Sequence, residues 1–87
     1  MGAARPKPIR LGEKLTAVRA KLGISLGELA DKLSDDEATV TRSDLYRFEN
    51  GSRDPSLVIL LRYSRLTRIR MEIFADDTLD LPDEWRN

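Results

Sequence analysis

Two short segments of this chain carry the same signals for starting a helix, and they constrain its fold more than any other feature. Ser25 precedes "LGEL" and is followed three positions later by Glu28, while Thr41 precedes "RSDL" and is followed three positions later by Asp44. In such a capping box the hydroxyl accepts a hydrogen bond from the third residue's amide, and the acid accepts one from the cap's own amide. We therefore predict helices that begin directly after Ser25 and directly after Thr41.

The first helix follows from apolar periodicity. Residues on one face of a helix recur three or four positions apart, and a left-handed Gly is a common helix end. A helix is therefore predicted before Gly23, with an inward face formed by Leu11, Leu15, Val18 and Leu22. Gly27, inside the second helix, costs about 1 kcal/mol relative to Ala. We expect a packing reason for it, namely the close approach of another helix.

Two further helices are predicted after Gly51, which ends the third. Asp54 is expected to cap the fourth helix, with Pro55 at its first position. Its inward residues are expected to be Leu57, Leu60, Leu61 and Ser64, and its outward residues Arg62 and Arg65. A short fifth helix is predicted within residues 67–77, with Ile69, Ile73 and Phe74 inward. No strand-like alternation occurs, so the predicted fold class is all-α, built from five short helices.

The 87 residues are expected to form one domain with two appended ends. Residues 1–9 are predicted to be a flexible basic arm, residues 10–75 the helical domain, and residues 76–87 an acidic C-terminal tail. The segment "SDDEAT", between the second and third helices, is polar, carries three acids and shows no periodicity. It is predicted to be a loop longer than a tight turn.

Composition excludes several classes of function. The chain has no histidine and no cysteine, so it lacks the commonest general base and the commonest metal ligands. We expect no enzyme activity, no cofactor and no metal site. The longest apolar run, "LVILL", is far shorter than the ~20 residues that cross a bilayer, and no apolar segment follows the start. We therefore expect neither a membrane span nor a signal peptide, and a cytoplasmic location.

The charges are balanced in total but not along the chain. Fifteen basic and fifteen acidic residues give a formal net charge of zero, which argues against binding nucleic acid by bulk charge. Residues 56–70 nevertheless contain four arginines and no acid, whereas residues 71–87 contain six acids and one arginine. A neutral total can therefore hide a basic face and an acidic face.

The order of these elements and two of their sequences resemble the lambda-repressor-like (Xre/Cro type) helix-turn-helix family. The matching segments, within residues 9–75, are "IRLGEKLTAVRAKLGISLGELADKL" and "RSDLYRFENGSRDPSLVILLRYSRL". The resemblance implies that the third helix, about Arg42 to Asn50, reads the major groove while the second, Leu26 to Leu33, crosses the DNA backbone. Two features depart from the family pattern: the lengthened loop between these helices, and Leu26, where the family often has a phosphate-contacting Gln.

The resemblance further implies a sequence-specific, double-stranded DNA-binding transcriptional regulator. Its candidate DNA-binding residues are Thr41, Arg42, Ser43, Tyr46, Arg47, Asn50, Ser52 and Arg53. Arg42 fits the commonest specific contact, arginine to guanine, and the alternative is a solvated helix face. Tyr46 is either a phosphate donor or a packed surface aromatic. Asp44 is interpreted as the capping acid rather than a DNA contact, and Asn50 also suits turn chemistry.

Similarity to the family also implies a structural ion pair between Arg19 and Glu49, and a homodimer formed through helices 4 and 5 with the C-terminal tail. Four arginines form either a solvated face or a surface that binds the acidic tail, in the same chain or in a second subunit: Arg62, Arg65, Arg68 and Arg70. The alternative functions are a protein-interaction module or an antitoxin that retains the fold with weak or no DNA binding. Another regulatory protein would then be a partner.

Overall fold

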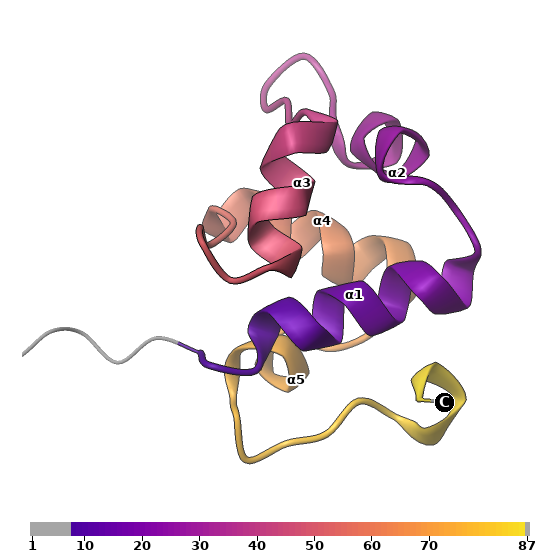
Figure 1. Ribbon diagram of the computed structural model, residues 1–87, viewed down its shortest axis with the longest axis vertical. Coiled ribbons are helices and arrows are strands. Elements are labelled where there is room, and N and C mark those ends of the chain that lie inside the picture. Colours follow the sequence, from indigo (N-terminus) through magenta and orange to yellow (C-terminus); the bar gives the residue numbers. More distant parts are fainter. Residues whose placement is uncertain (1–7, 87) are drawn as a thin grey trace, which may run out of the picture.

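The computed structural model describes residues 8–86, and these residues form helices without strands. The helices are α1 (Leu11–Leu22), α2 (Leu26–Leu33), α3 (Arg42–Glu49), α4 (Leu57–Thr67) and α5 (Met71–Ala75), followed by a 3-10 turn, η1 (Asp83–Trp85). Figure 1 shows α3 at the front, α1 below it and α4 behind, with the tail passing underneath. The predicted all-α fold of five short helices is confirmed. Most of the predicted basic arm, residues 1–7, lies outside the described residues.

Both predicted capping boxes are present. In α2 the Ser25 hydroxyl accepts from the Glu28 amide at 3.1 Å, and the Glu28 carboxylate accepts from the Ser25 amide at 3.2 Å. In α3 the equivalent distances between Thr41 and Asp44 are 3.1 and 2.9 Å. Gly23 ends α1 with a φ of 70°, a left-handed conformation that costs a glycine little. Local sequence signals therefore fix where α1 ends and where α2 and α3 begin.

The start of α4 differs from the prediction. The helix begins at Leu57, and its cap is Ser56, whose hydroxyl accepts from the Ile59 amide at 3.2 Å. Asp54 is therefore not the cap, and Pro55 is not the first helical residue. A serine that is already extended, with a ψ of 162°, supplies the acceptor two residues later than expected.

The inward face of α4 was also predicted in the wrong phase. The buried residues are Ile59, Leu60, Tyr63 and Thr67, so of the four predicted inward residues only Leu60 is buried. Leu57 is 75% exposed. The run "LVILL" places apolar side chains around almost the whole helix, so periodicity could not fix its rotation. In the observed rotation of α4, the large Tyr63 ring is buried and packs against Phe74, with ring centroids 6.3 Å apart.

The glycine that allows a close approach between two helices is Gly12 of α1, not Gly27 of α2. A Cβ at Gly12 would lie 2.6 Å from the Glu49 carbonyl oxygen and 3.1 Å from that of Phe48, at the end of α3. A Cβ at Gly27 would meet only the Ser25 hydroxyl, at 3.9 Å. The expectation that Gly27 admits another helix is therefore wrong. Backbone atoms cannot move aside as a flexible side chain can, so Gly12 sets the spacing of α1 and α3.

The loop between α2 and α3, residues 34–41, is folded back on itself. The Ser34 hydroxyl accepts from the Val40 amide at 2.9 Å, and the Asp35 carboxylate accepts from the Glu37 and Ala38 amides at 2.8 and 3.0 Å. Arg62 was expected to point away, but its side chain is only 17% exposed and bonds to this loop. The physical reason is that the lengthened loop offers it a carboxylate and backbone carbonyl oxygens.

The acidic tail packs against α1 of the same chain. The Asp77 carboxylate accepts from the backbone amides of Ile9 and Arg10, at 2.8 and 3.0 Å, where α1 lacks a side-chain cap of its own. The Arg10 guanidinium donates to the Asp77 carbonyl oxygen and to Asp80, at 2.8 and 2.7 Å. Lys14, almost fully buried, donates to carbonyl oxygens at the end of α5. Among the described residues, the tail therefore binds the start of α1 and not the arginines of α4.

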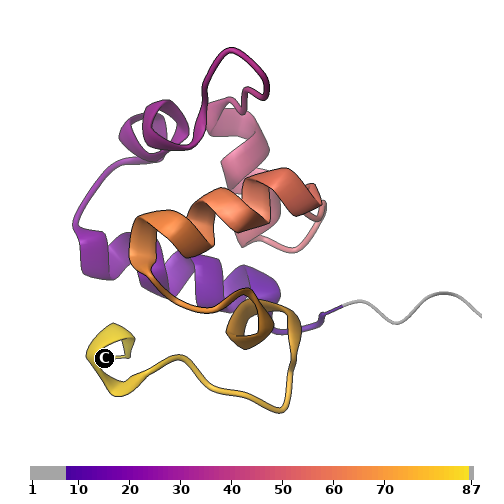
Figure 2. The same cartoon turned by 180° about the vertical axis from the view of Figure 1, so that it is seen from behind.

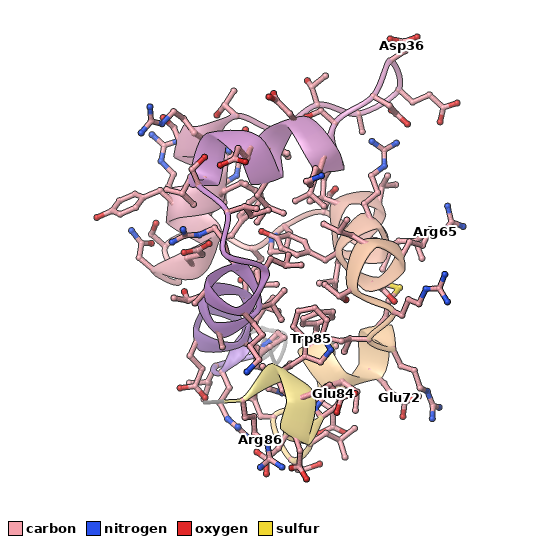
Figure 3. All side chains as sticks on the ribbon, turned by 90° about the vertical axis from the view of Figure 1, so that its right-hand side faces the viewer. Asp36, Arg65, Glu72, Glu84, Trp85 and Arg86 are labelled. Carbon is pink, nitrogen blue, oxygen red and sulfur yellow. The ribbon has the colours of Figure 1, made fainter. Side chains whose placement is uncertain are left out.

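Apolar contacts complete this attachment. Leu81 is buried, and Trp85 packs partly buried against the core with η1 lying along α1. Figure 3 shows Trp85 directed toward the body of the domain and Arg86 directed away from it. None of the helices in the described part has the length and apolar character needed to cross a membrane.

Substitution of the two glycines should have opposite effects on stability. Gly12→Ala must displace the α3 backbone, so we expect it to lower the free energy of unfolding by about 1–3 kcal/mol. Gly27→Ala adds a methyl group to open space and improves helix propensity, so we expect a gain of about 0.5–1 kcal/mol. Urea denaturation of both variants measures the difference. Equal effects would mean that the α1–α3 contact is looser than described.

Acid should release the tail before it unfolds the helices. The pKa of Asp77 is lowered, first by the bond from the Ile9 amide and then by that from the Arg10 amide; the pKa of Asp80 is lowered by the Arg10 side chain. Because both values lie below the ordinary value of 3.8, this stabilisation is complete above about pH 4 and is lost as pH falls through the lowered values. Fluorescence of Trp85, the only tryptophan, should report release, with helical circular dichroism as the control. Simultaneous loss of both signals would contradict the expectation.

Candidate nucleic-acid interface

The outer face of α3 and the segment after it form one continuous surface. All eight candidate residues are exposed: Thr41, Arg42, Ser43, Tyr46, Arg47, Asn50, Ser52 and Arg53. Six of them line a single open depression together with Leu26 of α2, whereas Thr41 and Arg53 are not part of its lining. The surface lies on the α3 side of the molecule, seen at the front in Figure 1. The candidate residues therefore lie on one accessible surface rather than scattered over the domain.

The inner face of α3 holds this surface in place. Leu45 and Phe48 point into the core and are 0% and 5% exposed. At the end of the helix, the Arg19 guanidinium donates to both Glu49 carboxylate oxygens, at 2.7 and 3.0 Å, and also to the Ile24 carbonyl oxygen at 3.2 Å. Arg19 thus joins α1, the residue before the α2 cap and the end of α3. This two-pronged geometry restrains the rotation of α3.

The acid on the outer side of α3 is engaged within the protein. Asp44 accepts the Thr41 amide through one oxygen and pairs with Arg53 through the other, at 2.9 and 3.3 Å. The pKa of Asp44 is lowered, chiefly by the bond from the Thr41 amide, and further by the nearby charges of Arg53 and Arg47. Its negative charge is therefore partly offset where an anionic ligand would approach, and Asp44 acts as the capping acid.

Arg42 and Arg47 differ from most other arginines of the structure. Their guanidinium groups are exposed, and no hydrogen bond or ion pair joins them to another side chain or backbone group among residues 8–86. By contrast, Arg10, Arg19 and Arg62 each bond to more than one group of the chain. Two cations on one helix face are thus available to an anion outside the protein, the property that a phosphate or base contact requires.

The turn after α3 is built by its own polar groups. The Asn50 side chain accepts from the Ser52 amide at 2.9 Å, and the Arg47 carbonyl oxygen accepts from the amides of Ser52 and Arg53 at 3.0 and 3.3 Å. Gly51 between them has a φ of 79°, a left-handed conformation that glycine adopts without strain. Asn50 therefore serves turn chemistry, which also keeps Ser52 and Arg53 beside the helix end.

Leu26 is the member of this surface that sequence reasoning did not select. It is partly buried and lines two neighbouring depressions, both of which it shares with Tyr46 and Asn50. Tyr46 is 60% exposed, so it is a surface aromatic with an accessible ring and hydroxyl. The signal was already present in the sequence, because Leu26 is the first residue of α2, where the resembled family often has a phosphate-contacting Gln. The site thus contains an apolar patch beside its arginines.

The described residues do not include a group of three or more His, Cys, Asp or Glu side chains placed to hold a metal ion. The exposed polar groups of the site are guanidinium, hydroxyl and amide groups, which bind phosphate oxygens and base edges.

A capped helix with an exposed polar face, preceded in the chain by a second short helix that packs against it, is the arrangement of the helix-turn-helix class of DNA-binding domains. A family model described as "Helix-turn-helix" matches residues 15–74, well over half of the chain. The protein therefore belongs to the lambda-repressor-like (Xre type) helix-turn-helix family, whose members are DNA-binding transcription regulators. Comparison with curated proteins and with solved structures gave no match.

The Arg19–Glu49 pair should show strong coupling in a double-mutant cycle. The Glu49 side chain is only 8% exposed, so Arg19→Met leaves a carboxylate with little access to water. We expect a loss of roughly 3 kcal/mol in the free energy of unfolding, near the lower end for a buried pair because Arg19 is partly exposed. The double variant Arg19→Met/Glu49→Leu should recover most of this loss in urea denaturation. Additive losses would show that the two groups do not act as a pair.

Proposed function

We propose that this protein is a sequence-specific, double-stranded DNA-binding transcriptional regulator that reads a two-fold site as a homodimer, with α3 in the major groove. One observation carries the proposal: Arg42 and Arg47 lie on the exposed face of α3, and their guanidinium groups make no hydrogen bond or ion pair with residues 8–86. The acids of that helix are engaged by Thr41, Arg53 and Arg19. Membership of the helix-turn-helix family supports the same reading.

A net charge of zero does not oppose this function, because affinity depends on the charges that reach the DNA. The guanidinium groups of Arg42 and Arg47 make no hydrogen bond or ion pair among residues 8–86, and Arg53 pairs with Asp44. The acidic tail passes beneath α1 (Figure 1), and its Asp77 and Asp80 bond to residues at the start of α1. Each phosphate neutralised contributes ~0.9 to the slope of log affinity against log salt. A small basic surface therefore predicts a moderate slope and a binding mode dominated by specific contacts.

The proposed homodimer would use the outer face of α4 and the neighbouring α5. Figure 2 shows α4 lying across the side of the molecule opposite α3. Leu57, Val58 and Leu66 are 75%, 49% and 36% exposed along it, and apolar side chains grouped on one helix are typical of protein contacts. The tail is a weaker candidate for this contact than the sequence indicated, since Leu81 is already buried within the same chain.

The test is selection of bound sequences from a random duplex library, followed by anisotropy titration of the selected site at two salt concentrations. Arg42→Ala should weaken binding to the selected site by about 1–3 kcal/mol and weaken random DNA less, because base contacts carry specificity. Lys21→Ala, which removes an exposed cation from the last turn of α1, outside both the α3 surface and the proposed dimer contact, is the control and should bind normally. A selected site with two half-sites about 34 Å apart would support the dimer.

Two results would overturn the proposal. One is the absence of any enriched sequence together with a flat salt response. The other is that the Arg42→Ala and Arg47→Ala variants both bind the enriched site with wild-type affinity. Equal losses on selected and random DNA would instead place Arg42 on a phosphate.

A further inference from the structure

The contacts of Arg62 belong neither to the proposed DNA-binding surface nor to the hydrophobic core. Its guanidinium donates to the Leu33 carbonyl oxygen, the last of α2, and to the Ala38 carbonyl oxygen of the loop, each at 3.0 Å. It also pairs with the Asp35 carboxylate at 2.7 Å. One side chain of α4 therefore binds the end of α2 and two points of the α2–α3 loop.

Asp35 continues this connection into the loop. Its other carboxylate oxygen accepts the amides of Glu37 and Ala38, and its own amide donates to the Ala38 carbonyl oxygen at 2.9 Å. The hairpin-like segment 35–38 is thus closed by Asp35 and attached to α4 by Arg62. The pKa of Asp35 is lowered by these bonds, first by that from the Ala38 amide and next by that from Arg62, so the carboxylate stays charged at neutral pH.

The attachment determines where two further carboxylates lie. Asp36 and Glu37 are exposed at the tip of the loop, only a few residues before the cap of α3. Figure 3 shows Asp36 at the upper right, on the same side of the molecule as Arg65 of α4, whereas the α3 ribbon lies to the left. The loop is thereby held toward α4 and away from the face that carries Arg42 and Arg47.

Because the loop is long, its position depends on its contacts with the rest of the protein. Eight residues, 34–41, join α2 to α3, and a connecting segment of that length is mobile unless it is bonded. At physiological salt, charges interact over a Debye length of about 8 Å. Carboxylates released from α4 at the entrance of α3 would come within that range of DNA phosphates and repel them.

We propose that Arg62 is a positioning residue for DNA binding: by bonding Leu33, Ala38 and Asp35 it holds the acidic α2–α3 loop against α4, so that Asp36 and Glu37 do not repel the DNA that α3 reads. This inference rests on the proposed function, because it concerns the same DNA-binding surface.

The experiment measures binding of the full chain to its selected duplex by anisotropy. Arg62→Met keeps the apolar stem and removes the bonds to the loop. It should weaken binding at 0.1 M salt by roughly tenfold, and the loss should shrink as salt increases, since it arises from repulsion. Lys21→Met, in the last turn of α1, removes the same charge from an exposed residue that is neither on the loop nor on α4 and is the control; it should bind as wild type does.

Charge removal in the loop separates repulsion from distortion. Asp36→Asn/Glu37→Gln in the Arg62→Met background should restore binding to within about twofold of wild type, whereas the same pair of changes in the wild-type background should alter binding little. A merely structural role of Arg62 would not be rescued in this way, because removing carboxylates does not realign α3. Thermal unfolding of each variant confirms that it is folded. If Arg62→Met does not fold, Asp35→Asn tests the same contact from the loop side and should produce a smaller loss with the same rescue.

The inference is overturned if Arg62→Met and Lys21→Met bind equally well, or if the loss in Arg62→Met persists after the two carboxylates are removed. Neither result affects the proposed function, which is tested separately by the wild-type chain and by the Arg42→Ala and Arg47→Ala variants.

Discussion

The junction between α1 and the end of α3 is the contact on which the rest of the structure depends. Gly12 lets the two backbones approach until a Cβ would collide with the Glu49 carbonyl oxygen, and Arg19, two turns further along α1, binds the Glu49 carboxylate through two hydrogen bonds. The first contact sets the distance between the helices and the second restrains their rotation. A helix of eight residues is too short to be stable alone, so α3 presents a defined face only because α1 holds its end.

In this neutral protein, the role of each charged side chain depends on whether it is bonded to another group of the chain. Arg10 binds the tail, Arg19 binds Glu49, and Arg62 binds the loop. Each of these contacts converts an arginine into a structural connection between segments far apart in the sequence. What remains available on the α3 side is a small set of guanidinium groups, which explains how a chain with a formal charge of zero can present a basic surface.

The sequence predicted those parts of the fold that are specified locally. The two capping boxes and the left-handed Gly23 involve residues within four positions of each other, so their chemistry can be recognised without knowing the tertiary structure. The phase of α4 could not be predicted in this way, because "LVILL" is apolar on nearly every side and only packing around Tyr63 selects the inward face. The exchange of roles between Gly27 and Gly12 has the same cause: which glycine meets another backbone depends on where α3 lies. Arg62 was misread because its partners, Leu33, Ala38 and Asp35, lie more than twenty residues away.

In the candidate site, too, local features could be predicted from the sequence and long-range contacts could not. The exposed residues of α3 could be chosen from the sequence, since helix boundaries and apolar positions together define which side chains face outward. The influence of the tail on that site could not, because it passes through contacts between residues nearly seventy positions apart. Asp77 supplies the acceptor that the start of α1 lacks, and the first turn of α1 includes Gly12, which rests on the end of α3. Loss of the tail would therefore fray α1 at the point where it supports α3. The described tail residues, 76–86, make no hydrogen bond or ion pair with the proposed DNA surface, yet they contribute to its shape through two successive helix ends.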